Sequence, residues 1–324
     1  MTTDMSKPQL MLEKARMLVE TLKEELKNKN FVVEILKSSS RKYCSDIIAL
    51  KPQKKEKIIM SLKCVIDINE CTRQNINELK KFCVSTGSTP LIVGLTSRRE
   101  ELLSGVVYKR FGVYAVHLST FIDALRGHKP IAFTERGGLY VNINGSSLKR
   151  ARLKKGYSLG ELAMKLGVSR KAVYDYEREK MSATLDIVSK LESILDENVI
   201  KPIDIFEWKE ERIAENSLPK RPLLRAVYCK VKSLGYDIFC FSRMPFDMIA
   251  FRHKEEKKIL IKILGKSNKI EETLKEIELS RKVAQLTSSD MIVVSDKKIP
   301  KIVEKEKYED INIVDKNNIQ HEIN

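Results

Sequence analysis

The chain has 324 residues and a formal net charge of +16, with 60 lysines and arginines against 44 aspartates and glutamates. This length exceeds that of one small helical module and favours two or three domains. The positive charge favours an anionic partner, and no run of 18 apolar residues is present, which argues against a membrane span.

The cysteines and histidines argue against a metal centre. Six cysteines are scattered without a Cys-x-x-Cys pair, mostly in apolar runs typical of reduced core residues. The four histidines lack ligand spacing to any cysteine pair, so neither zinc nor another cofactor is expected. The first residues lack the pattern of a signal peptide, which predicts a cytoplasmic protein.

The N-terminal part predicts an α/β domain. An amphipathic helix is expected around residues 8–28, before a three-stranded meander that includes Asp46–Leu50 and Ile58–Met60. A charged helix over about 69–86 then leads to a buried strand at Leu91–Val93. A strand that crosses over a helix to a neighbour implies a mixed sheet with helices on its faces.

A short hairpin and a helical region follow. Glycines punctuate two strands predicted at Ile131–Phe133 and Leu139–Ile143. Residues 147–196 then predict four short helices.

Turn and capping signals divide this helical region. Ser158 and Glu161 form a capping box at the second helix, Gly167 permits the positive φ of a tight turn, and Ser169 caps the third helix. The expected inward-facing residues are Leu148, Ala151, Leu153, Leu162, Ala163, Leu166, Val168, Ala172, Val173, Tyr176, Leu185, Val188, Leu191 and Leu195.

Basic residues concentrate on the first three of these helices. Residues 146–180 carry a net charge of +6, whereas residues 181–200 carry −3. A local basic surface of this kind is expected where helices face phosphates. The basic residues of the first helix that we expect to contact phosphate are Lys149, Arg150, Arg152, Lys154 and Lys155.

The C-terminal part repeats the N-terminal part. Asp247–Phe251 aligns with the strand that begins at Asp46, and Ile259–Ile261 aligns with the next strand, both at an offset of 201 residues. The other repeated elements are helices around 220–234 and 268–288 and a strand at Met291–Val293.

The helical region resembles the Cro/CI-type helix-turn-helix of phage repressors, also called the XRE family. The resemblance is carried by LKRARLKKGYSLGELAMKLGVSRKAVYDYE, with the motif over Leu159 to Arg178. It implies that the N-terminal half of the third helix enters the major groove of DNA. Leu159 stands where the family often has Gln, and Glu179 stands where it often has Gly. The residues implied to contact bases or phosphates are Leu159, Ser169, Arg170, Lys171, Tyr174, Asp175 and Arg178.

The repeated element order resembles the PD-(D/E)xK nuclease fold of restriction enzymes and archaeal Holliday-junction resolvases. That chemistry needs an Asp on one strand and Glu-x-Lys on the next, because two carboxylates hold Mg²⁺ and the lysine steadies the attacking water. The first copy offers Asp46 and Lys63 but has Ser61 at the Glu position, with Asp67 or Glu70 as candidates for a migrated carboxylate.

In the second copy, the same alignment leaves Asp247 but places Lys262 and Leu264 where Glu and Lys are needed. Both copies are therefore expected to be degenerate, with no catalytic residues beyond the remnants in the first copy. The copies would then serve packing, dimer contacts or an effector pocket.

The whole chain resembles a family of archaeal helix-turn-helix regulators through RGGLYVNING, the central motif and KPIDIF at 201–206. The predicted fold class is α/β plus all-α: two mixed-sheet nuclease-like domains flank a four- to five-helix Cro/CI-type domain. The predicted boundaries are 1–130 for the first nuclease-like domain, 131–206 for the hairpin and helices, 207–222 for a linker and 223–324 for the second nuclease-like domain.

The predicted function is sequence-specific transcription regulation by a homodimer bound to double-stranded DNA. One alternative is a metal-dependent, structure-selective nuclease with the helix-turn-helix as its targeting arm. A third interpretation is an antitoxin or an architectural chromatin protein.

Overall fold

The computed structural model describes residues 7–37, 43–52, 57–135, 138–208, 218–252, 257–264, 270–295, 312–315 and 318–319. Its contacts divide the chain into two compact units. Unit 1 comprises Met1–Val65, Glu70–Leu91 and Trp208–Asn324, and unit 2 comprises Ile66–Asn69 and Ile92–Glu207. Within the described part, no helix combines the length and apolar character needed to cross a bilayer.

The first copy of the repeat has the predicted element order. Its helices and strands are α1 (Lys7–Asn28), β1 (Val32–Ile35), β2 (Ile47–Lys51), β3 (Ile58–Cys64), α2 (Arg73–Thr86) and β4 (Thr89–Gly94). The residues of β4 are divided between the two units. Strands β1, β2 and β3 pair antiparallel. The amphipathic helix α1 buries Leu18, Leu22 and Leu26, which lie on one face because they are four residues apart.

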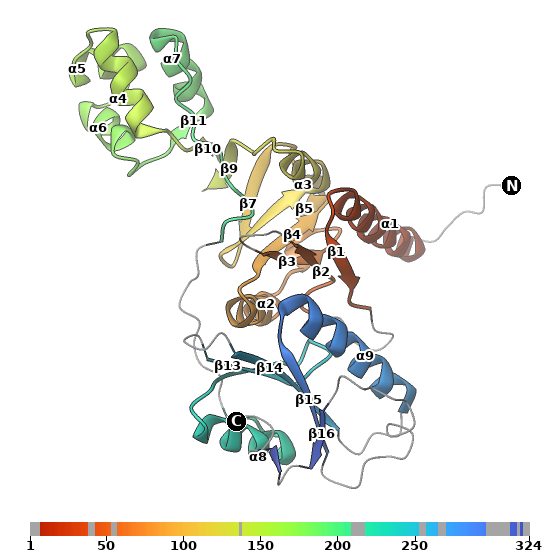
Figure 1. Ribbon diagram of the computed structural model, residues 1–324. Coiled ribbons are helices and arrows are strands. Elements are labelled where there is room, and N and C mark those ends of the chain that lie inside the picture. Colours follow the sequence, from red (N-terminus) through yellow and green to blue (C-terminus); the bar gives the residue numbers. More distant parts are fainter. Residues whose placement is uncertain are drawn as a thin grey trace, which may run out of the picture. The chain divides into compact units, whose positions relative to one another are not determined.

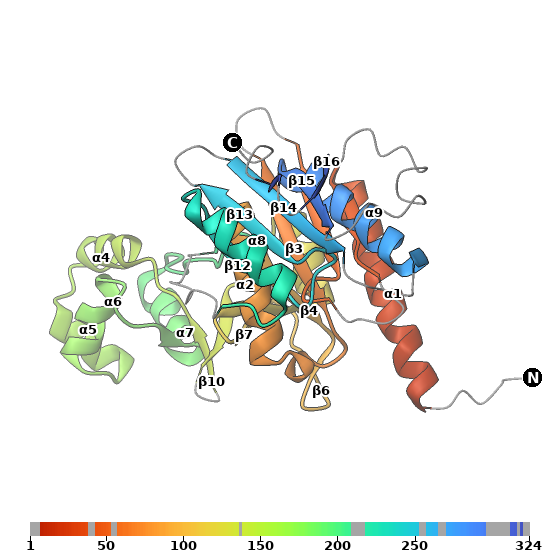
Figure 2. The same cartoon turned by 90° about the horizontal axis from the view of Figure 1, so that it is seen from below.

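The second copy follows the same order. Its elements are α8 (Pro222–Ser233), β12 (Asp237–Cys240), β13 (Met248–Arg252), β14 (Lys257–Leu264), α9 (Ile270–Thr287), β15 (Asp290–Ser295) and β16 (Asn312–Asp315). Strands β12, β13 and β14 form an antiparallel meander, and β15 and β16 continue the sheet in parallel. Figure 2 shows α8 lying across the sheet, so the predicted mixed sheet with helices is confirmed in this copy.

The register of the two meanders corrects the predicted alignment. The last paired residues before the turn are Lys51 and Ile58 in the first copy, but Arg252 and Lys257 in the second. The second hairpin is therefore shorter by two residues, and β14 aligns with β3 at an offset of 199 rather than 201. Lys262 consequently corresponds to Lys63.

The two copies pack against each other within unit 1. Helix α2 contacts β12 and β13 of the second copy, and α9 contacts β1 and β2 of the first (Figure 1). The buried Glu78 carboxylate accepts hydrogen bonds from the backbone N–H groups of Ser242 and Arg243 at 3.0 and 2.8 Å. Contacts thus group most of both copies in one unit, whereas the sequence suggested separate flanking domains.

Unit 2 contains the remaining strands and helices. Before the helical region it has β5 (Thr96–Ser97), β6 (Glu100–Glu101), β7 (Val106–Arg110), β8 (Val113–His117), α3 (Leu118–Leu125), β9 (Ala132–Glu135) and β10 (Gly138–Val141). Strands β9 and β10 pair antiparallel, which confirms the predicted hairpin. The residues between these strands lie outside the described part of the chain.

Four helices complete unit 2 and form one cluster (Figure 1). They are α4 (Gly145–Lys154), α5 (Leu159–Leu166), α6 (Arg170–Glu177) and α7 (Leu185–Leu195), with the short strand β11 (Ala183–Thr184) between α6 and α7. Both hydrogen bonds of the predicted capping box are present at α5, and Gly167 ends that helix with a φ of 70°. The predicted cap at Ser169 is also confirmed, because its side chain accepts a hydrogen bond from the Ala172 backbone N–H.

Several details of the helical cluster differ from prediction. Leu185, expected to face inward, is 41% exposed at the start of α7. Helix α4 begins at Gly145, where the Asn144 side chain caps it, rather than near residue 147. Leu153, expected in the core, is 59% exposed, and Arg152 is buried instead. Leu148 and Ala151 are buried as predicted, so the buried face of α4 continues through Arg152 and leaves Leu153 outside it.

Gly145 allows α4 to approach α6 closely. A Cβ atom at this position would lie 2.2 Å from the Glu177 carbonyl oxygen, which is backbone and cannot rotate away. We expect Gly145→Ala to destabilise the cluster by about 1–3 kcal/mol. Hydrogen exchange of α4 and α6 amides in the full chain would measure this loss.

The matched control is Gly160→Ala in α5, where the nearest atom to a new Cβ is the Ser158 Oγ at 3.9 Å. Alanine favours helix over glycine, so this variant should keep or slightly increase protection. Equal protection in both variants would contradict the close approach inferred at Gly145.

Candidate nucleic-acid interface

Helix α6 presents a continuous exposed polar face. Arg170, Lys171, Tyr174 and Arg178 are exposed and recur at spacings of one and four residues, which place them on neighbouring positions of one helix face. Val173 and Tyr176 lie in the core on the opposite side. Burial of these two residues fixes which face of α6 points to solvent.

Tyr174 and Arg178 form a pair on this face. The Arg178 guanidinium lies over the Tyr174 ring, 5.2 Å from its centroid, and donates a hydrogen bond to the Tyr174 hydroxyl. Asp175 is half-buried beside this face. The pairing restricts both long side chains, so less conformational entropy is lost when they contact a ligand.

Arg152 is not part of the exposed surface, which corrects its predicted role as a phosphate contact. Arg152 is 7% exposed, and its guanidinium forms a bidentate ion pair with the Glu177 carboxylate. Nε donates to Oε1, and Nη2 donates to Oε2 at 3.2 Å. Nη1 donates a further hydrogen bond of 2.7 Å to the Tyr157 carbonyl. Arg152 therefore joins α4, the turn before α5 and the end of α6.

The other basic residues of α4 and its end remain at the surface. Lys149, Arg150 and Lys155 are exposed, and Lys154 is exposed while paired with Glu197 at 2.8 Å. Such an exposed pair contributes little stability, so a phosphate can replace its carboxylate at low cost. Leu159 is half-buried against the core of the cluster, so its contribution there is packing.

The corrected register brings both remnant nuclease sites to the same arrangement. In the first copy, Asp46 accepts a hydrogen bond from the Cys64 backbone N–H at 2.7 Å and pairs with Lys63 Nζ at 3.1 Å. In the second, Asp247 accepts one from the Ile263 backbone N–H at 2.9 Å and lies 3.8 Å from Lys262 Nζ. The predicted replacement by Lys262 and Leu264 was therefore wrong.

Neither copy has a Glu at the position where the nuclease chemistry requires one. Ser61 occupies it in the first copy and donates a hydrogen bond of 2.9 Å to the Ser45 hydroxyl. The corrected register places Leu260 there in the second copy, as the partner of Ile249. Neither side chain supplies a carboxylate, so the residues present do not fit the two-carboxylate Mg²⁺ site of the nuclease fold.

In the second copy, a lysine ammonium occupies the space between two carboxylates. Lys262 Nζ bonds to Glu276 on α9 and lies near Asp247, and all three residues are buried. The Arg221 guanidinium adds a second bond to Asp247 at 2.8 Å. These cations neutralise the carboxylates without a metal ion.

The candidates for a migrated carboxylate serve other purposes. Burial raises the pKa of Asp67, but hydrogen bonds from Asn69 and Arg99 outweigh it and hold that pKa below its usual value. Glu70 is exposed in a short 3₁₀ helix, Ile68–Glu70. Across the described residues, no three His, Cys, Asp or Glu side chains converge as a metal site.

The cysteines are free thiols, as the scattered spacing predicts. Burial raises the pKa of the Cys83 and Cys240 thiols to about 12, which keeps them protonated at neutral pH. Protonated, buried thiols are poor metal ligands and poor nucleophiles.

Family comparisons match both parts of the chain. A PD-(D/E)XK superfamily domain matches residues 15–130, and a helix-turn-helix domain matches residues 148–199. A chain of a SinR protein/SinI protein complex is 33% identical over 17% of this chain and 55% of that chain, with a TM-score of 0.17.

Relatives that match about four fifths of the chain come from archaea. Their names describe them as HTH-type transcriptional regulatory proteins. The protein of Pyrococcus furiosus is 34% identical over 82% of this chain and 83% of its own length. The protein of Thermococcus kodakarensis is 36% identical over 80% of this chain and 79% of its own length. The protein of Methanocaldococcus jannaschii is 33% identical over 79% of this chain and 79% of its own length.

Removing one partner of the Arg152–Glu177 pair should unfold or loosen the cluster. We expect Arg152→Met to cost about 3–5 kcal/mol, because it leaves the Glu177 carboxylate buried without its cation. Lys149→Met is the matched control, since this exposed lysine should change stability by less than about 0.5 kcal/mol. Hydrogen exchange of α4 to α6 would compare them, and a stable Arg152→Met cluster would contradict the structural role.

Proposed function

We propose that this chain, which belongs to the family of archaeal HTH-type transcriptional regulatory proteins, is a sequence-specific DNA-binding regulator of transcription. The observation that carries the proposal is the exposed polar face of α6, held by buried Val173 and Tyr176 and by the Arg152–Glu177 pair. In this proposal α6 enters the major groove and reads base edges.

The exposed side chains divide into two roles. Arg170 or Lys171 can donate two hydrogen bonds to guanine O6 and N7, which discriminates against other bases by about 1–3 kcal/mol. Tyr174 and Asp175 add contacts beside them, and Ser169 and Arg178 lie at the two ends of α6, within reach of phosphates. Lys149, Arg150, Lys154 and Lys155 supply affinity that depends on salt but not on sequence.

We further propose that the protein acts as a homodimer in the cytoplasm. Modules of this type read two half-sites about 34–36 Å apart, and one short recognition helix contacts too few bases to select an operator alone. The unit that contains the two nuclease-like copies is the candidate for the dimer contact.

Substitution of the proposed reading residues should remove specificity and leave general DNA affinity. We expect Arg170→Ala with Lys171→Ala to weaken binding to the specific site by about tenfold to a hundredfold. Lys149→Ala with Arg150→Ala should weaken specific and non-specific DNA alike and make the salt dependence shallower. Gel shifts on the promoter region of the chain's own gene, with a scrambled duplex, would measure both. Unchanged specific binding in the first variant would refute the assignment of α6.

Metal-dependent DNA cleavage is the second candidate function, favoured by the PD-(D/E)XK match over residues 15–130. The local chemistry argues against it, because Ser61 and Leu260 replace the Glu and lysines neutralise both aspartates. We propose that the two copies are degenerate and do not cleave DNA.

We expect no cleavage of linear or branched DNA by the purified chain in Mg²⁺ or Mn²⁺. Asp46→Asn is the control that distinguishes the chain from a contaminating nuclease, since contaminant activity would persist in it. Cleavage that the parent shows and Asp46→Asn loses would overturn the non-enzymatic proposal.

A further inference from the structure

The N-terminal half of α1 carries an exposed apolar surface. Four large apolar side chains within eight positions of this helix are exposed, namely Leu10, Met11, Leu12 and Met17. Leu12 is the most exposed of them at 74%, and Met17 follows at 63%. Single exposed apolar residues are ordinary on soluble proteins, but a group of them on one element indicates a surface that another molecule covers.

This surface continues the buried stripe of the same helix. Leu18, Leu22 and Leu26 are buried where α1 contacts β1, β2 and β3. Met11 lies two turns before Leu18 on the same helix face, yet it is 46% exposed. Figure 2 shows the N-terminal end of α1 projecting from the rest of unit 1. These strands therefore cover the C-terminal half of α1 and leave its N-terminal half exposed.

The charges on α1 argue against an anionic partner. Residues 10–27 carry four acidic and four basic side chains, so this stretch has no net charge in a chain of +16. Helices that lie on anionic membranes carry mostly basic residues on their polar face, and DNA likewise requires an excess of cations. A neutral helix with exposed apolar side chains instead fits a protein surface.

The side chains of this surface are complementary to one another. When two α1 helices lie antiparallel and cross at the middle of residues 12–17, Leu12 of each copy faces Met17 of the other. The same alignment sets Glu13 opposite Arg16. Both of these residues are exposed, and neither forms an ion pair with another described residue. Two-fold symmetry repeats each contact, so a single helix face supplies both partners.

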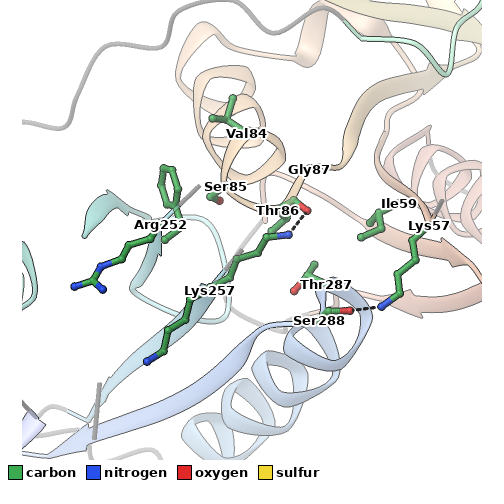
Figure 3. Close-up of a pocket in the computed structure, with 12 residues that line it drawn as sticks. Lys57, Ile59, Val84, Ser85, Thr86, Gly87, Arg252, Lys257, Thr287 and Ser288 are labelled. Carbon is green, nitrogen blue, oxygen red and sulfur yellow. Dashed lines mark hydrogen bonds between the residues drawn. The ribbon is translucent and has the colours of Figure 1, made fainter. Parts of the chain in front are cut away.

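The junction between the two nuclease-like copies is already joined within one chain. Lys57 before β3 donates to the Ser288 hydroxyl beyond α9 at 2.8 Å, and Lys258 on β14 donates to the Thr86 carbonyl at 3.0 Å (Figure 3). These bonds connect the copies beside a cavity of about 690 Å³. The polar side chains at this junction therefore hold unit 1 together, which leaves the apolar surface of α1 as its candidate contact with a second chain.

We propose that α1 packs antiparallel against α1 of a second copy of this chain. The contact rests on the proposed homodimer and supplies its interface. Leu10, Leu12 and Met17 bury their apolar surface, and the Glu13–Arg16 pairs at the rim fix the direction of the two helices. Two short helix segments bury less than the roughly 1,200 Å² of a stable interface, so we expect a Kd on the order of 1–100 µM.

The test measures the oligomeric state of the full chain by sedimentation equilibrium without DNA, over concentrations that span the expected Kd. We expect Leu12→Gln with Met17→Gln to raise Kd by about tenfold to a hundredfold, because less apolar area leaves water on association. The matched control is Leu103→Gln with Met164→Gln, which removes two exposed apolar side chains from unit 2 and should leave Kd unchanged.

Reversal of the charges tests the antiparallel direction. Arg16→Glu alone sets like charges against each other in both pairs and should raise Kd by about threefold. Addition of Glu13→Arg to this variant restores opposite charges and should return Kd to that of the parent. Failure of the double variant to recover would overturn the antiparallel pairing.

Circular dichroism would check that each variant folds; if Leu12→Gln with Met17→Gln does not, Leu12→Gln alone is scored by the same criteria. A parent that stays monomeric throughout, or an equal Kd in parent and variant, would overturn the proposal. So would binding of the monomeric chain to phosphatidylglycerol vesicles that the variant loses, because it assigns the surface to lipid. Since no DNA is present, each of these failures would leave the proposed DNA reading by α6 intact.

Discussion

The buried ion pair between Arg152 and Glu177 determines how the proposed reading helix is held. Both side chains are about 8% exposed, so their charges have left water at a large desolvation cost. Two parallel bonds to the carboxylate and one to the Tyr157 carbonyl offset that cost. Because the pair joins α4 to the last residue of α6, it fixes the axial rotation of α6 and leaves Arg170 and Lys171 in solvent.

The same contact imposes constraints on nearby residues. Gly145 must lack a side chain for α4 to reach the Glu177 carbonyl, and Glu179 adopts a φ of 55° just beyond α6. Glu179 then accepts a hydrogen bond from the Gly145 backbone N–H at 3.2 Å. This chain has Glu where related motifs often have glycine, and that hydrogen bond helps to offset the strain of a left-handed non-glycine residue.

The two nuclease-like copies show that an aspartate can have a structural role where the neighbouring strand carries no Glu. Asp46 and Asp247 each accept the backbone N–H of the residue that follows the opposed lysine. The carboxylate therefore completes the hydrogen bonding of the meander where β2 and β13 begin. Its contacts therefore show a role in joining neighbouring strands.

Local signals made much of the fold predictable. Helix caps and turns could be placed from sequence alone, because the residues that form them contact only the nearest helix end. These residues are Ser158, Glu161, Gly167 and Ser169. The alternation of apolar runs likewise gave the element order of both copies. Features that depend on distant partners were missed. The apolar spacing of α4 gave no sign that Arg152 would meet Glu177, 25 residues later.

The register of the second meander was missed for a related reason. A two-residue difference in hairpin length leaves the apolar pattern intact, because a shift by two keeps every side chain on the same face. The sequence alignment therefore looked continuous, although it placed Lys262 two residues away from its true counterpart, Lys63. Strand pairing alone revealed that Lys262 corresponds to Lys63.

A lysine in place of a metal ion changes how such a fold can bind phosphate. In a nuclease of this fold, Mg²⁺ neutralises the carboxylates and binds the phosphate at the same point. Here Lys63 and Lys262 neutralise the aspartates internally, so those positions have no excess positive charge to offer a ligand. Recognition of phosphate must then come from cations that lack an acidic partner nearby. The exposed basic face of the helical cluster is the candidate for that contact, and it requires no divalent ion. Its affinity should vary with salt and not with chelation, because counterion release and not metal coordination drives it.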